Sequence, residues 1–109
     1  MRTLRFKVDG QTIDLDPNCD FSGLIPGSEG VMQAEFIFSK EWDGYTKVAA
    51  FFSNLGHEYE PQIIQRNMTC KIPVEALQRG IFKVQVVGQR KDMKMRTNKV
   101  AVHQRGGNV

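Results

Sequence analysis

The chain has 109 residues, the size of a single domain, and its hydrophobic fraction of 40% is enough for one modest core. Its formal net charge is +3 at pH 7. No run approaches the roughly 18 apolar residues that a membrane-spanning helix requires, and residues 1–11 lack the apolar stretch of a secretory signal. We therefore expect a soluble single domain that is made in the cytoplasm.

The first elements read as a hairpin followed by a long loop. Residues 4–8 (LRFKV) alternate apolar and basic side chains, as a strand with one buried face does. Asp9-Gly10 is a favoured pair for a tight turn, and alternation continues over residues 13–15. Residues 16–30 contain two Pro and three Gly and predict a loop, with at most a short edge strand around Phe21.

The middle of the chain predicts a buried strand, a corner and a second strand. Residues 31–38 (VMQAEFIF) place apolar side chains on one face and are expected to form a central strand. Residues 39–44 (SKEWDG) begin with an N-cap residue and end in Gly, so we expect one helical turn or a compact loop, with Trp42 filling one end of the core. Residues 46–53 (TKVAAFFS) predict another strand.

The remaining elements are short strands and one further helical turn. A turn at residues 54–56 leads into a return strand over 57–64, which Pro61 restricts to a sheet edge because proline cannot donate to a strand ladder. The expected elements after it are a strand over 68–72, a one-turn helix over 72–77 with Pro73 near its start, a strand over 81–88, a charged turn over 89–94 and a last strand with Val100 and Val102 inward.

About eight short strands separated by turns, with no long helical period, predict an all-β fold. We expect an antiparallel β-sandwich of immunoglobulin-like or jelly-roll-like form over residues 1–104, and a flexible tail over 105–109. The expected core anchors are the bulky apolar residues Phe6, Phe36, Phe38, Trp42 and Phe82.

Residue types that carry chemistry are present but are not arranged as a site. Neither histidine, His57 nor His103, has a spacing that brings it to a nucleophile, and strand alternation places His57 on the opposite face from Glu58 and Glu60. A solvated loop explains the acidic residues at 14–20 better than a calcium site does, because the glycine and final Glu of a calcium loop are missing. We expect no catalytic, metal or cofactor site, and not an enzyme.

Two cysteines, Cys19 and Cys70, are too few for a disulfide framework and lie in no zinc-binding spacing. We therefore favour free thiols over a bridge between them.

Charge is distributed unevenly along the chain. Six cations and one anion follow Gln89, a net charge of +5, which leaves −2 for residues 1–88. Clustered cations are typical of surfaces that bind nucleic acid or acidic proteins, so the hairpin that carries Arg90, Lys91, Lys94 and Arg96 is the candidate partner-binding site. The plainer interpretation, a solvated edge hairpin, is favoured over it. Nucleic acid is disfavoured because no aromatic residue follows Phe82 to stack on bases.

Four phrases of the sequence carry a family resemblance: LRFKVDGQTI, FIFSKEWDGYTKVAAF, CKIPVEAL and TNKVAV. In this order they resemble the N-terminal domain of phage baseplate upper proteins and related tail or head-fibre structural proteins, from Leu4 to Val102. The resemblance implies a non-enzymatic β-sandwich that attaches to the virion and carries a fibre or receptor-binding part. Because the chain stops near the sandwich boundary, we expect that distal part to be absent.

The leading hypothesis is therefore a virion structural protein that decorates a capsid or forms a head-fibre base or a baseplate or tail adaptor. Its expected partners are other virion proteins of the capsid or tail, and we expect it to be oligomeric on the particle. No membrane partner is expected. The alternative hypothesis is a carbohydrate- or cell-surface-binding module, for which the candidate aromatic residues are Trp42, Tyr45, Phe51 and Tyr59. A nucleic-acid-binding barrel is a third hypothesis, which the basic hairpin alone supports.

Overall fold

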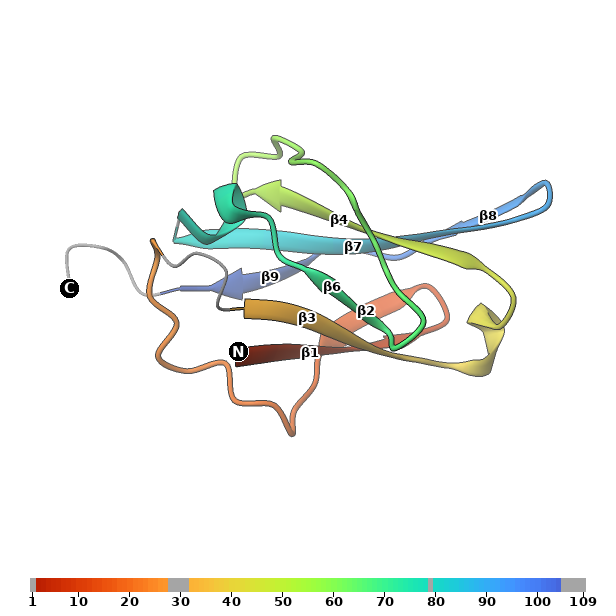
Figure 1. The fold of residues 1–109 in the computed structure, drawn as a ribbon, viewed down its shortest axis with the longest axis horizontal. Coiled ribbons are helices and arrows are strands. Elements are labelled where there is room, and N and C mark those ends of the chain that lie inside the picture. Colours follow the sequence, from red (N-terminus) through yellow and green to blue (C-terminus); the bar gives the residue numbers. More distant parts are fainter. Residues whose placement is uncertain (1, 28–31, 79, 105–109) are drawn as a thin grey trace.

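The computed structural model describes residues 2–27, 32–78 and 80–104, and they form two packed β-sheets (Figure 1). The described elements are the strands β1 (Arg2–Asp9), β2 (Thr12–Leu15), β3 (Met32–Phe38), β4 (Thr46–Ser53), β5 (Gln62–Ile63), β6 (Thr69–Lys71), β7 (Ile81–Arg90), β8 (Met93–Arg96) and β9 (Val100–His103), and the 3-10 helices η1 (Lys40–Trp42) and η2 (Val74–Gln78). The predicted all-β sandwich is confirmed. The expected tail at 105–109 and the first residue of the expected strand, Val31, lie outside the described residues.

Sheet A has the strand order β2-β1-β3-β6. The predicted opening hairpin is confirmed: β1 and β2 pair antiparallel, and Gly10 takes the positive φ of 55° that the tight turn requires. One pairing departs from the expected antiparallel pattern, because β1 and β3 run parallel, with Phe6 opposite Phe36. Parallel neighbours need a long connection, and the segment between Leu15 and Met32 provides it. No strand forms in the described part of that segment, where Phe21 instead packs its ring against Phe6.

Sheet B has the order β5-β4-β7-β8, and β9 pairs with the other half of β7. β8 lies along residues 87–90 of β7 and β9 along residues 81–84. At the break between them, Thr97 continues the ladder, because its amide donates to the Val86 carbonyl at 3.0 Å and its hydroxyl accepts from the Val86 amide at 3.0 Å. The expected charged turn over 89–94 is shorter than predicted: the strands extend to Arg90 and Met93, and the hairpin projects from the body of the sandwich (Figure 1).

The predicted return strand over 57–64 is mostly irregular. Only β5 and an isolated bridge between Phe52 and Glu58 form there. β5 is an edge strand, as predicted from Pro61. The predicted helical turns are both present as 3-10 helices, η1 and η2.

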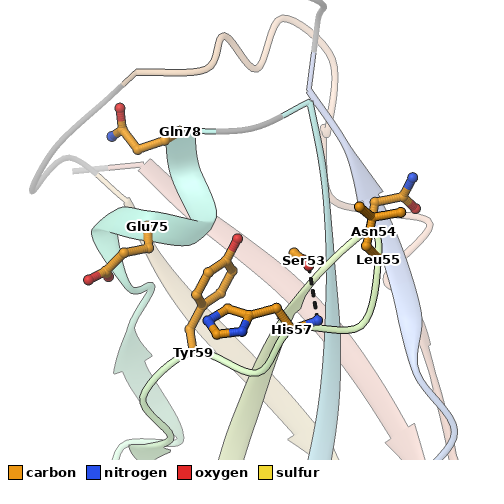
Figure 2. A pocket seen from close by; sticks show the side chains of 7 residues that line it. All are labelled: Ser53, Asn54, Leu55, His57, Tyr59, Glu75 and Gln78. Atoms are coloured by element: carbon orange, nitrogen blue, oxygen red, sulfur yellow. Dashed lines mark hydrogen bonds between the residues drawn. The ribbon is translucent and has the colours of Figure 1, made fainter.

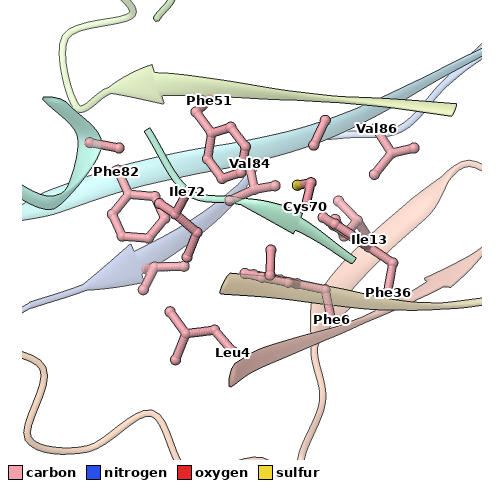
Figure 3. Packing of buried hydrophobic residues seen from close by; sticks show 14 of the residues in the cluster. Leu4, Phe6, Ile13, Phe36, Phe51, Cys70, Ile72, Phe82, Val84 and Val86 are labelled. Carbon is pink, nitrogen blue, oxygen red and sulfur yellow. The ribbon is translucent and has the colours of Figure 1, made fainter. Parts of the chain in front are cut away.

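The core fills the space between the sheets (Figure 3). Of the expected anchors, Phe6, Phe36, Trp42 and Phe82 are buried. Phe38 is only half-buried and packs against the cluster from its margin, with its ring 5.4 Å from the ring of Trp42. It lies at the last position of β3, where the chain turns into η1, and the Lys47 ammonium is 5.2 Å from the centroid of its ring.

Trp42 closes one end of the core and is held from several directions. Its indole N–H donates to the Gly10 carbonyl at 2.8 Å, and Gly88 on β7 leaves the space that the ring occupies. Ser39 has the extended N-cap conformation before η1, but its hydroxyl accepts from the Gly10 amide at 3.0 Å and makes no cap bond to the helix. These contacts join the η1 corner to the β1–β2 turn.

Asn98 joins the two sheets at the β2 edge. Its side chain accepts from the Ile13 amide at 2.8 Å and donates to the Ile13 carbonyl at 3.2 Å. The amide group thus pairs with β2 as a neighbouring strand would, which satisfies main-chain groups that otherwise lie at a sheet edge.

Candidate docking surface

The basic hairpin does not present its four cations on one surface. Cross-strand partners share a face, and Lys94 and Arg96 lie opposite Gln89 and Val87 on the side of sheet B that points away from the core. Arg90 is on the other side of the hairpin, where its guanidinium lies over Gly44: a Cβ on that glycine would be 3.5 Å from Arg90 Nε. All four cations are solvent-exposed.

Lys91 occupies the tip of the hairpin. With Asp92 it forms the two-residue loop between the pair Arg90 and Met93. Its φ of 54° is in the left-handed region, which glycine and asparagine adopt more easily than lysine does. The tip is thus held in a conformation that its sequence disfavours.

Two of the hairpin cations belong to a larger surface, which we call the outer face of sheet B. Strand register places on this face the apolar side chains of Ile63, Val48 and Val87, which form one row across β5, β4 and β7 and end at Arg96. Ile63 is 70% exposed. An apolar row of this kind on an exposed sheet is unusual for a face that only meets water.

A second row of the outer face combines an aromatic ring with lysines. Phe52 lies opposite Lys83, and the Lys99 ammonium is 3.9 Å from the centroid of the Phe52 ring. Phe52 is only 7% exposed although it does not belong to the cluster between the sheets. The Lys99 ammonium lies over the ring as a cation–π contact, and Lys83 is the cross-strand neighbour of Phe52.

The outer face of sheet A has a different character. Here Arg5 bonds to Glu35 at 3.0 Å and to Asp16 at 3.5 Å. These hydrogen bonds raise the pKa of Arg5, with Glu35 as the larger cause. Thr3 accepts a hydrogen bond from Gln33 on the same face. On sheet A, Arg5 is thus paired with carboxylates, whereas among the described residues no carboxylate lies within ion-pair distance of the sheet B cations, nor of Lys7 and Lys71 on sheet A.

The lysines and the apolar row of the outer face of sheet B were not predicted from the sequence. A signal was present: residues 46–53 carry apolar side chains at both odd and even positions, so both faces of that strand had to be apolar. Lys83 and Lys99 join the hairpin cations only through register, which alternation within one strand does not reveal.

A pocket of about 590 Å³ lies where the turn after β4 faces η2 (Figure 2). His57 and Tyr59 form its wall, with their rings 5.5 Å apart and nearly perpendicular. The Ser53 hydroxyl accepts from the backbone amide of His57 at 3.0 Å, so this bond closes the turn and does not pair a nucleophile with an imidazole. The other lining residues are Asn54, Leu55, Glu75 and Gln78.

The aromatic residues of the carbohydrate hypothesis do not form one platform. Trp42 and Phe51 are buried, and Tyr45 is half-buried beside Trp42, with ring centroids 5.8 Å apart. Tyr59 is half-buried and lies in the pocket between the turn and η2.

Both cysteines are free thiols. Cys70 is buried in the core, and this burial raises its pKa to about 12. Cys19 is half-buried, and its sulfur accepts from the Arg5 amide at 3.3 Å. Nowhere in the described parts of the chain do three His, Cys, Asp or Glu side chains gather as a metal site would require.

Comparisons with known proteins identified no matching family, curated relative or solved structure. Within the described residues, no helix is both long and apolar enough to span a membrane.

Proposed function

We propose that the chain is a structural protein of a bacteriophage virion, a non-enzymatic β-sandwich that docks on the particle as a capsid decoration, head-fibre base or baseplate or tail adaptor. The proposal starts from the resemblance of four sequence phrases to such domains. Each phrase contains a residue with a defined role in the fold: Gly10 in the first turn, Trp42 at the η1 corner, Cys70 in the core and Asn98 between the sheets. The phrases therefore coincide with residues that specify the sandwich.

The observation that carries a docking role is the difference between the two outer faces. Sheet A pairs Arg5 with Glu35 and Asp16. Sheet B leaves cations without carboxylate partners beside an apolar row in which Ile63 is exposed and Val48 and Val87 are half-buried. A protein whose role is to dock on another protein needs a surface that can bind it, and protein interfaces usually have an apolar centre with a polar or charged rim.

Purified particles test the proposal. The chain should be detected by mass spectrometry in particles banded on a density gradient and then washed in high salt, at a stoichiometry that is constant between preparations. A known non-structural protein from the same infection serves as the control for carry-over. Absence of the chain from washed particles, with normal abundance in the infected-cell extract, contradicts the proposal.

A further inference from the structure

We propose that the chain attaches through the outer face of sheet B and that its partner there is an acidic protein surface with an apolar centre. This inference rests on the proposed function and identifies the face and the chemistry of the contact. The candidate residues are those of the apolar row, Ile63, Val48 and Val87, and the surrounding cations Lys83, Lys94, Arg96 and Lys99.

The apolar row supplies the centre of the proposed contact. Its three side chains come from adjacent strands, so they form a continuous strip on a rigid sheet. Burying such a strip against a partner removes apolar area from water at no cost of ordering a loop.

The positive charge beside the apolar row indicates the charge of the partner. Four cations lie on the same face as the row, and among the described residues register places one carboxylate there, Glu58, in the bridge opposite Phe52. Potentials across an interface are complementary, so a surface of this sign fits an acidic partner. A second copy of the same face is disfavoured, because a two-fold contact would bring lysines against lysines.

Nucleic acid fits this face less well than a protein does. Binding of single strands uses exposed aromatic rings on which bases stack. The row on this face is aliphatic, and its aromatic ring, Phe52, lies beneath Lys99 and is 7% exposed. The face therefore offers cations for phosphate but no platform for bases.

Lysine labelling on wild-type protein tests the inference without any substitution. The isolated chain and washed particles are treated with an amine-reactive acetylating reagent, and modification of each lysine is compared. We expect Lys83, Lys94 and Lys99 to be protected severalfold in the particle. Lys7 and Lys71, on the outer face of sheet A, are the matched controls and should react equally in both samples.

The outcomes separate the two proposals. Absence of the chain from particles overturns the proposed function and this inference with it. Presence of the chain with protection of Lys7 and Lys71 instead, or with no difference between the faces, overturns this inference alone. Protection of Lys83 and Lys99 that disappears when particles are emptied of nucleic acid also overturns it, because the partner is then the genome.

Matched variants test the two components of the face separately. Lys83→Glu combined with Lys94→Glu should lower occupancy on particles about tenfold or more, because like charges then face each other, whereas Lys71→Glu should not. Ile63→Ser should also lower occupancy, and Leu55→Ser, at a residue that is 96% exposed on the turn after β4, is its control. Unchanged thermal melting excludes misfolding, and equal occupancy of each variant and its control refutes the inference.

Discussion

The substitution Gly88→Ala tests how tightly the end of the core is packed. A Cβ on Gly88 would lie 2.7 Å from Cζ3 of Trp42 and 3.0 Å from Cδ2 of Tyr45. Carbon atoms in favourable contact are about 3.5–4.0 Å apart, so the indole must move by roughly 0.8 Å or more. It has little freedom to do so, because its N–H is bonded to the Gly10 carbonyl at 2.8 Å and its other side packs on Phe38.

Overpacking of this kind costs about 1–3 kcal/mol. Replacing a strand glycine by alanine returns roughly 0.5–1 kcal/mol through the lower entropy of the unfolded chain. We therefore expect the free energy of unfolding to fall by up to about 2.5 kcal/mol, with a decrease in Tm of roughly 4–8 °C for each kcal/mol. Urea unfolding followed by the fluorescence of Trp42, the one tryptophan of the chain, measures the effect at the site itself.

Gly80→Ala is the matched control. At Gly80 the nearest atom to an added Cβ is the Gln104 carbonyl oxygen, at 3.9 Å, and the backbone is outside the left-handed region. That variant should be as stable as the parent or more stable by up to about 1 kcal/mol. In a Trp42→Phe background the smaller ring leaves room, so Gly88→Ala should cost at least about 1 kcal/mol less there, with unfolding followed by circular dichroism because the tryptophan is gone. Equal stability of Gly88→Ala and Gly80→Ala would refute the packing argument.

Three further predictions concern single residues. Asn98→Ala should lower the free energy of unfolding by about 1–3 kcal/mol and speed hydrogen exchange at the Ile13 amide, because the amide and the carbonyl of Ile13 both lose their hydrogen-bond partner. An unchanged exchange rate would show that water replaces the Asn98 side chain. Burial raises the pKa of Cys70 to about 12, so between about pH 9 and pH 12 the folded state keeps a proton that the unfolded thiol has lost; the stability that the buried neutral thiol contributes is therefore present below about pH 9 and is lost as pH rises toward 12. At pH 8 a thiol reagent should modify Cys19 first and Cys70 only on unfolding, and comparable rates for the two thiols would contradict the burial of Cys70. Lys91→Gly should raise the free energy of unfolding by about 0.5–1 kcal/mol by relieving the positive φ at the hairpin tip, measured by urea unfolding, and a loss of stability would place the strain elsewhere.

Much of the local structure could be predicted because it depends on neighbours in sequence. The Asp9-Gly10 turn specified the first hairpin, and residues 46–53 form β4 with the bounds expected. The parallel pairing of β1 and β3 could not be predicted, because a strand alternates in the same way beside a parallel or an antiparallel neighbour. The role of Asn98 was also hidden, since its partner, Ile13, is 85 residues away in the chain.

The candidate docking surface was predicted only in part. Composition identified the cations of the hairpin, because they are close together in sequence. It could not show that Arg90 lies on one side and Lys94 on the other, or that Lys83 and Lys99 extend the surface, because these relations depend on strand register. The nature of a face is a property of several strands together, and the pattern of a single strand does not reveal it.

The parallel pairing of β1 and β3 has a consequence for the order of folding. Partners in this pair, such as Phe6 and Phe36, are 30 residues apart, so closing that loop costs about 3 kcal/mol of chain entropy before any contact is gained. The β1–β2 hairpin closes over a few residues and can form within microseconds. We therefore expect the β1–β2 hairpin to form before β3 pairs with β1, and the stacking of Phe6 on Phe36 to be gained only with that later pairing.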